Sequence, residues 1–235
     1  MTVEVLFREV CNLNADGQNS VYLQQSMPDA EFIYTSIHDE PYFKDNEPDI
    51  IMMGHMSESF QREVIKKLMP LKDRIEELID AGKVFLMTGN ACEVFCRHIS
   101  YVTEKIETDA LGIFPLDAKC DLFKRYNGKL LADFEGIKLV GFKSQFSFLF
   151  GDNSSFAFAK CLRGAGINKE SSFEGMRRNN FFGTHLSGPI LPLNPLFTEY
   201  IMRLAGCPGE AAFRDAAMAA YEQHIKEFED PAVKF

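Results

Sequence analysis

The sequence has 235 residues, which suits one α/β domain or two small ones. Hydrophobic residues make up 46% of the chain and charged residues 25%, as in an ordered globular protein with a sizeable core. The net charge of -9 and the lack of a dense Lys/Arg patch argue against nucleic acids and anionic membranes as partners.

The N-terminus and the cysteines bear on the compartment. The first ten residues show no basic region followed by a long apolar run, so no secretory signal is visible. No stretch approaches the roughly 18 apolar residues that a membrane span needs. The six cysteines lack the spacing of a disulfide framework. We therefore predict a cytoplasmic protein with reduced thiols and no membrane association.

The first 56 residues predict three strands and one short helix. An apolar run predicts a strand over Val3 to Phe7, and a polar turn precedes a short helix that begins near Asn19. The stretch EFIYT, residues 31–35, predicts a second strand. The run PDIIMMG, residues 48–54, is short, apolar and closed by glycine, which is typical of a buried parallel strand.

Residues 57–102 continue the α/β alternation. Apolar residues recur at helical spacing from Val64 to Ile79, and Pro70 is expected to break or kink this helix or to begin a second one. Gly82 is a plausible helix stop. KVFLMT, residues 83–88, predicts a strand, and CEVFCRHISYV, residues 92–102, is expected to begin the next helix. The order predicts a mostly parallel sheet with helices on both faces.

From residue 111 the pattern becomes β-rich, with short apolar runs separated by Gly, Asp and Asn turns. Two helices are predicted at the C-terminal end, over residues 194–205 and 209–228, with Pro208 and Gly209 between them. No internal repeat or long linker is visible. A single α/β unit with a β-rich second half is the prediction.

Four blocks of sequence, in order, resemble the cobyric acid synthase type of class I glutamine amidotransferases. They resemble most closely the glutaminase subunits of lipid II isoglutaminyl synthases. The blocks are PDIIMMGHMSESFQREVIKKL (48–68), LIDAGKVFLMTGNACEVF (78–95), IKLVGFKSQFS (137–147) and RGAGINKESSFEGMRRNNFFGTHLSGPILPLNP (163–195). A match of four blocks in order and spacing is more specific than any single motif.

The resemblance implies a flavodoxin-like domain over residues 1–206, with residues 207–235 as a helical extension packed on it. In this family a cysteine on a sharp turn after a strand, the nucleophile elbow, attacks the side-chain amide of glutamine. A histidine activates the cysteine, and backbone N–H groups of a Gly-rich loop stabilise the oxyanion. The released ammonia passes to a Mur-ligase-like synthetase partner. We expect no cofactor and no bound metal.

The family's nucleophile is absent from its expected position. The family elbow reads Cys-Gly-Gly-Tyr-Gln. The spacing from Gly82-Lys83, and Glu93 in place of the glutamine, put Gly89 at the cysteine position. A shift by one residue would put Thr88 there instead. Neither register places a cysteine at the turn.

The other chemical positions are changed as well. The family's Tyr-Leu-His-Gly-Pro corresponds to His185-Leu186-Ser187-Gly188-Pro189, so that Ser187 replaces the base and His185 lies two residues earlier. The family's Gly-Phe-Glu-Asn-His corresponds to residues 141–145, which lose the acid and the histidine. The residues expected to line the former pocket, where a small amide or amino acid ligand would bind, are Gly54, His55, Thr88, Asn90, Glu93 and Gln145.

A displaced catalytic pair of Cys92 and His185 is geometrically conceivable, since Cys92 lies one helical turn past the elbow. His185 would share a strand face with the lost base. Against this pair, an elbow needs small residues around its tip, and Val94 is bulky and β-branched.

More ordinary interpretations compete for the same residues. Cys92, Cys96 and His98 have a spacing that could hold a metal, but buried thiols are the better interpretation. His185 can equally be a hydrogen-bonded residue of a half-buried strand, and Glu93 can cap a helix.

Two functional hypotheses follow from the altered site. The first is a non-catalytic relative that binds a ligand or a Mur-ligase-like partner, and the second is an active amidotransferase or amide hydrolase that uses Cys92 and His185.

Overall fold

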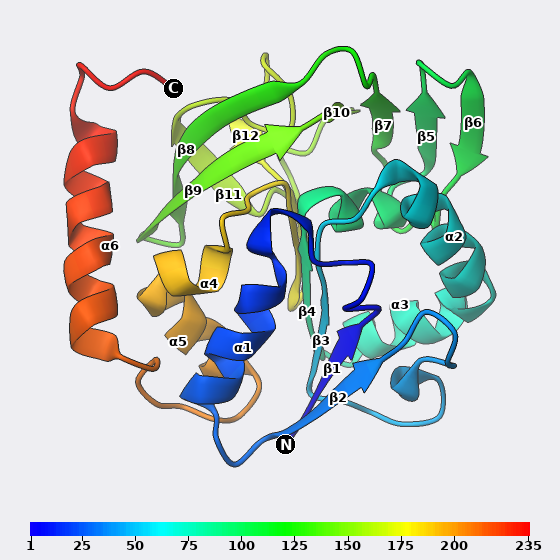
Figure 1. The fold of residues 1–235 in the computed structure, drawn as a ribbon, viewed down its shortest axis with the longest axis horizontal. Helices are drawn as coiled ribbons and strands as arrows, with labels where there is room; N and C mark the ends of the chain where they lie inside the picture. The colour runs from blue at the N-terminus through cyan, green and yellow to red at the C-terminus, as the bar shows by residue number, and fades with distance from the viewer.

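Six strands form the central sheet of the computed structural model, which describes residues 1–235 (Figure 1). The strand order is β13-β14-β4-β3-β1-β2, and every neighbouring pair is parallel except the β13–β14 edge pair. The five parallel strands follow the flavodoxin-like order. The strands are β1 Thr2–Leu6, β2 Glu31–Thr35, β3 Ile50–Met53, β4 Val84–Thr88, β13 Met176–Arg178 and β14 Phe181–Thr184.

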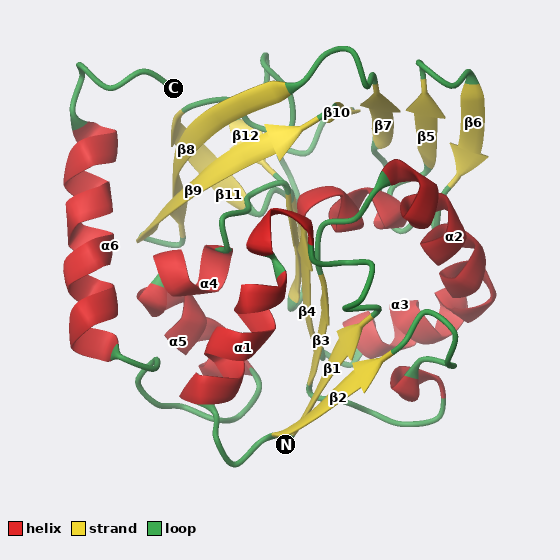
Figure 2. Cartoon of the chain, in the orientation of Figure 1, coloured by secondary structure: helices red, strands yellow, loops and turns green.

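Helices cover both faces of this sheet (Figure 2). Because side chains alternate along a strand, Ile51 and Met53 of β3 join one core cluster with the helices α2 and α3. Ile50 and Met52 join the other with α1, α4 and α5. The helices are α1 Gly17–Ser26, α2 Glu58–Leu68, α3 Lys72–Asp80, α4 Ile190–Leu193 and α5 Pro195–Leu204.

The second half of the chain builds two smaller sheets near the carboxyl ends of the central strands (Figure 1). Their strand orders are β10-β7-β5-β6 and β12-β11-β8-β9. The strands are β5 His98–Tyr101, β6 Ile106–Asp109, β7 Asp117–Cys120, β8 Tyr126–Phe134, β9 Ile137–Gln145, β10 Ser147–Phe150, β11 Ala159–Arg163 and β12 Phe173–Glu174. The structure thus confirms the predicted fold class, including the β-rich second half.

Pro70 separates two helices, as one of the predicted alternatives had it. The helix α2 begins after Ser57, whose hydroxyl accepts a hydrogen bond from the N–H of Phe60, and ends at Leu68. A 3₁₀ turn over Met69–Leu71 contains the proline, and α3 begins at the next residue. Proline lacks an N–H group and its ring crowds the preceding turn, which accounts for the break between the two helices.

The helix predicted from Cys92 onwards is wrong. Residues Gly89–Phe95 form a tight 3₁₀ helix, η4, in which every residue is buried, and the chain then enters strand β5. Residues 98–101 alternate between half-buried and buried positions, which is the period of a strand rather than a helix. The tertiary contacts of this segment with the β-rich half outweigh the helix-like spacing of its apolar residues.

The last helix, α6 Arg214–Glu229, packs against β8 and β9. Its Tyr221 and Phe228 are buried, and the Tyr221 hydroxyl donates to the carbonyl of Lys138 at 2.7 Å. Arg163 donates to the carbonyls of Phe228 and Val233 at 2.6 and 2.7 Å. No helix of the structure combines the length and the apolar character required to cross a membrane.

Candidate functional site

The turn that follows strand β4 has an elbow conformation at Gly89. This residue has a φ of +60°, in the left-handed region that favours glycine. A Cβ atom built on Gly89 would lie 2.6 Å from both Cβ and Nδ1 of His55. The space that a side chain at this position would enter is therefore taken by the imidazole ring of His55.

His55 is held in this place from two sides. Its backbone N–H donates to Oδ2 of Asp16 at 2.9 Å. The Nδ1 atom of its ring lies 3.1 Å from the side-chain amide nitrogen of Asn14. Burial lowers the pKa of His55 to about 4. The ring is therefore neutral near pH 7, and it fills the elbow as an uncharged group.

The loop beside the elbow uses its own N–H groups inside the chain. Asn90 clamps this loop, since its Oδ1 accepts from the N–H of Met56 at 3.0 Å and its Nδ2 donates to the Met56 carbonyl at 2.9 Å. The N–H of His55 is already paired with Asp16. The backbone N–H groups of His55 and Met56 therefore both donate to acceptors within the protein, and neither is directed at a ligand.

Glu93 and His185 form a buried pair behind the elbow. The Nε2 atom of His185 lies 2.7 Å from Oε1 of Glu93, and both side chains are about 1% exposed. Gln61 donates to Oε2 of Glu93 at 2.9 Å, and the Ser147 hydroxyl donates to Oε1. Burial alone would raise the pKa of Glu93, but the hydrogen bonds and the charge of His185 outweigh burial and lower it.

A second buried carboxylate fixes the backbone at His185. Oε1 of Glu174 accepts from the His185 N–H at 2.9 Å and from the Thr184 hydroxyl at 2.8 Å. Its Oε2 accepts from Nζ of Lys143, which also donates to the Gly166 carbonyl at 2.6 Å. Glu174 thereby joins β12, β9 and the end of β14.

Cys92 lies inside the core rather than at the surface of the site. Its side chain is fully buried and packs near Gly183 of β14, and burial raises the pKa of its thiol well above the ordinary value. It makes no hydrogen bond with His185, whose Nε2 is paired with Glu93 and whose Nδ1 has no protein partner. A thiol in this state is a poor nucleophile.

Three further residues that the sequence analysis singled out, Thr88, Ser187 and Gln145, make hydrogen bonds within the protein. Thr88 donates to Asp16 at 2.8 Å beside the elbow. The Ser187 hydroxyl donates to the Phe142 carbonyl at 3.2 Å. Gln145 donates to the Ser147 carbonyl, next to the Glu93 pair.

Several residues of the site were not singled out from the sequence, chiefly Asp16, Gln61, Ser147 and Glu174. Lys143 lies in the stretch 141–145 that differs from the family's Gly-Phe-Glu-Asn-His. Its buried partner, Glu174, could not be inferred from sequence spacing.

The thiols and His98 do not gather at one point. The two ring nitrogens of His98 lie 2.6 Å from Glu107 and 3.1 Å from Asp109 on the neighbouring strand. Cys92 and Cys96 are buried. The structure has no group of three or more His, Cys, Asp or Glu side chains that could hold a metal ion.

A pocket of about 200 Å³ opens on the outer side of His55. Arg125 stands on one wall, where its guanidinium donates to Ser144 at 2.7 Å and lies over the ring of Phe146. Glu58 lines the same pocket, and burial raises the pKa of its carboxyl group. The pocket thus places a cation, a carboxyl group and hydroxyls around one small space.

Comparison with known proteins gives one informative match. No family model matches the chain. The chain is 26% identical over 211 residues to the protein named lipid II isoglutaminyl synthase (glutamine-hydrolyzing) subunit GatD of Staphylococcus aureus strain N315. The aligned region covers 87% of this chain and 84% of that relative. Over most of its length the chain is therefore similar to a glutamine amidotransferase-like subunit.

Proposed function

We propose that this protein is a glutamine amidotransferase-like subunit that does not hydrolyse glutamine. One observation carries the proposal: His55 occupies the space that a nucleophile side chain at Gly89 would need. Amide hydrolysis by this family needs a nucleophile and a base within hydrogen-bond reach, and donors directed at the oxyanion. Gly89 has no side chain, and the resemblance to the family puts Ser187 at the position of the base.

The N–H groups of the loop support the same proposal. An oxyanion hole works because preorganised donors point to the place where negative charge develops. Here the N–H groups of His55 and Met56 donate to Asp16 and Asn90. A tetrahedral intermediate at the elbow would find these donors already paired.

In place of hydrolysis, we propose that the pocket outside His55 binds a small amino acid or amide. Arg125 offers a planar guanidinium suited to a carboxylate. Glu58, on the same pocket, offers a carboxyl group suited to an ammonium group. A zwitterionic amino acid such as glutamine or glutamate matches this pair of charges.

We further propose that the subunit works beside a Mur-ligase-like synthetase in a cell-wall amidation system. The similar Staphylococcus aureus protein is named as a subunit of lipid II isoglutaminyl synthase. All six cysteines are unpaired, which suits a reducing compartment, and we place the complex in the cytoplasm.

The first prediction concerns hydrolysis. The purified chain, alone and together with a Mur-ligase-like synthetase, is expected to release ammonia from glutamine at least about a thousandfold more slowly than a Cys–His amidotransferase. An assay coupled to glutamate dehydrogenase measures this rate, with the Staphylococcus aureus subunit as the positive control.

A glutaminase rate near that of the control would contradict the proposal. If that rate disappeared in Cys92→Ala and in His185→Ala, the rearranged Cys92 and His185 site would be the correct interpretation. The buried thiol and the pairing of His185 with Glu93 argue against this outcome.

The second prediction concerns ligand binding. We expect glutamine or glutamate to bind with a Kd that rises about 10- to 100-fold in Arg125→Ala, because a charge-assisted hydrogen bond to the carboxylate is lost. Isothermal titration calorimetry measures the Kd of each variant for glutamine and for glutamate. Arg97→Ala is the matched control, since Arg97 pairs with Asp117 outside the pocket. An equal loss in both variants would exclude this pocket as the binding site.

A further inference from the structure

The His55 ring leaves one of its two edges free. A Cβ atom built on Gly89 would lie 2.6 Å from Cβ and from Nδ1 of His55 and 2.7 Å from its Cγ, so this edge of the ring faces the elbow. The contact of Nδ1 with the side-chain amide nitrogen of Asn14, at 3.1 Å, is the ring's one hydrogen bond in the chain. The opposite edge carries Nε2, which the chain leaves without a partner.

The contact with Asn14 decides which ring nitrogen carries the proton. An amide nitrogen donates hydrogen bonds and does not accept them. Burial lowers the pKa of His55 to about 4, so near pH 7 the ring holds a single proton. Nδ1 accepts the hydrogen bond from Asn14. The proton therefore resides on Nε2, which makes Nε2 a donor.

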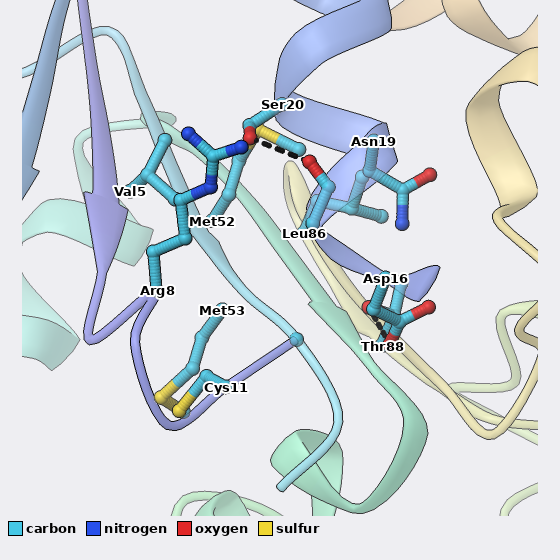
Figure 3. A pocket seen from close by; sticks show the side chains of 12 residues that line it. Val5, Arg8, Cys11, Asp16, Asn19, Ser20, Met52, Met53, Leu86 and Thr88 are labelled. Atoms are coloured by element: carbon cyan, nitrogen blue, oxygen red, sulfur yellow. Dashed lines mark hydrogen bonds between the residues drawn. The ribbon is translucent and has the colours of Figure 1, made fainter. Parts of the chain in front are cut away.

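A strained turn holds Asn14 against the ring. Asn14 and Ala15 both have φ angles in the left-handed region, at 56° and 63°. Such conformations are costly outside glycine and persist where the surrounding structure holds them. The next residue, Asp16, anchors the turn. Its Oδ2 accepts from the backbone N–H of His55 at 2.9 Å and from the Thr88 hydroxyl at 2.8 Å (Figure 3). The turn that carries Asn14 is thereby tied to the backbone of His55.

The Nε2–H group of His55 reaches the outer pocket, which is the space of about 200 Å³ beside His55, Glu58 and Arg125. Nε2 is not among the buried side-chain atoms that lack a partner, so it is in contact with solvent. Arg125 and Glu58 suit the carboxylate and ammonium groups that all amino acids share. The uncharged donor of His55 is therefore left for the side chain, the part by which amino acids differ.

We propose that the Nε2–H group of His55 selects the ligand of the outer pocket, and that Asn14 is the positioning residue that keeps the proton on Nε2. The class selected is an amino acid whose side chain carries a hydrogen-bond acceptor, such as a carboxamide, carboxylate or sulfone oxygen. An apolar side chain would leave the Nε2–H group without a partner in the filled pocket, which weakens binding. This inference rests on the proposed function, in which the outer pocket binds a small amino acid.

Nuclear magnetic resonance reads the position of the proton directly. In protein labelled with ¹⁵N-histidine, long-range ¹H–¹⁵N correlations distinguish a protonated from an unprotonated ring nitrogen, and the His55 signals are those missing in His55→Gln. At about pH 8.5, where a neutral ring is expected, we expect a protonated Nε2 and a bare Nδ1. Asn14→Asp is expected to reverse the two, because a carboxylate only accepts and takes the proton of Nδ1. Aspartate also tolerates the left-handed backbone at this position.

Calorimetric titration of the unmodified chain measures the selection. The probes are glutamine, methionine sulfone and norleucine, each titrated separately as its L and D form. They have side chains of similar length and the same net charge, but norleucine lacks an acceptor. Glutamine and methionine sulfone are expected to bind about 3- to 10-fold more tightly than norleucine, the worth of one hydrogen bond to an uncharged group.

Asn14→Asp separates a positioning role from a merely structural one. With Nε2 turned into an acceptor, methionine sulfone is expected to fall to the affinity of norleucine. Glutamine is expected to keep its advantage over norleucine, because its carboxamide can turn and donate. The charge of the new carboxylate cancels in these ratios of Kd. Asn127→Asp is the matched control, since Asn127 accepts from the Ser144 hydroxyl at 2.9 Å and does not touch His55, and it should leave the ratios unchanged.

Two results would overturn the inference and leave the proposed function standing. One is equal binding of methionine sulfone and norleucine by the unmodified chain, and the other is a bare Nε2 at His55. Failure of all three amino acids to bind would instead overturn the proposed ligand, and the selection with it. A glutaminase rate near that of an amidotransferase would overturn the non-hydrolytic function without altering the ratios of Kd, so the failures are distinguishable.

Discussion

Replacement of Lys143 by methionine is expected to lower the free energy of unfolding by about 3 to 5 kcal/mol, the usual cost of removing one partner of a buried ion pair. The side chain of Lys143 is 1% exposed, and its ammonium group lies against the fully buried Glu174. Burial would raise the pKa of Glu174, yet the charges of Lys143 and His185 and the hydrogen bonds it accepts lower it. Without Lys143 that buried carboxylate would lose the positive charge that compensates it most.

Urea unfolding followed by circular dichroism measures the effect, because the chain has no tryptophan for fluorescence. The matched control is the double variant Lys143→Met, Glu174→Gln. The glutamine keeps an acceptor for the Thr184 hydroxyl and the His185 N–H but carries no charge. We expect the double variant to regain most of the lost stability.

A loss below about 1 kcal/mol in Lys143→Met would mean that water reaches Glu174 and that the pair contributes as little as a surface salt bridge. The outcome matters for the site as well as for the fold. Glu174 accepts from the backbone at His185, so the ion pair positions the strand end that carries the buried His185–Glu93 contact.

The central sheet was predictable from the sequence because its strands are short apolar runs that end in glycine or polar turns. Ile50–Met53 and Val84–Thr88 are buried at every position, as strands in the middle of a parallel sheet must be. Alternate residues of each strand contribute to different core clusters. Periodicity and strand length carry this information locally, so that no long-range contact is needed to infer it.

The segment after β4 was not predictable in the same way. Apolar spacing between Cys92 and Val102 suits a helix, but the chain forms a 3₁₀ helix and then strand β5. The reason lies in tertiary contacts, since β5 pairs with β6 and β7, which follow it in the sequence. A short apolar run alone does not distinguish the two outcomes.

The polar network of the site joins residues that are far apart in the sequence. Glu93 meets His185 across 92 residues, and Thr88 meets Asp16 across 72. Sequence spacing identified Glu93 and His185 as separate candidates but gave no reason to pair them. The assignment of Gly89 and Ser187 to the family's nucleophile and base positions stays a prediction, which the elbow conformation of Gly89 supports.

The elbow itself offers the second large effect. Gly89→Cys is expected to lower the free energy of unfolding by about 2 to 4 kcal/mol, from overpacking against His55 together with the left-handed backbone at a non-glycine residue. The new Cβ would lie 2.6 Å from both Cβ and Nδ1 of His55, a residue that Asp16 and Asn14 hold in place. Urea unfolding measures the change.

The variant His55→Gly in the same background separates the two causes. It removes the clash and leaves the backbone conformation at position 89 unchanged, so the double variant should recover about 1 to 3 kcal/mol relative to Gly89→Cys. Recovery of that size would show that His55 closes the elbow to any side chain. If His55→Gly gave no recovery, the strain would lie in the backbone alone, and the steric argument for a non-hydrolytic site would fail.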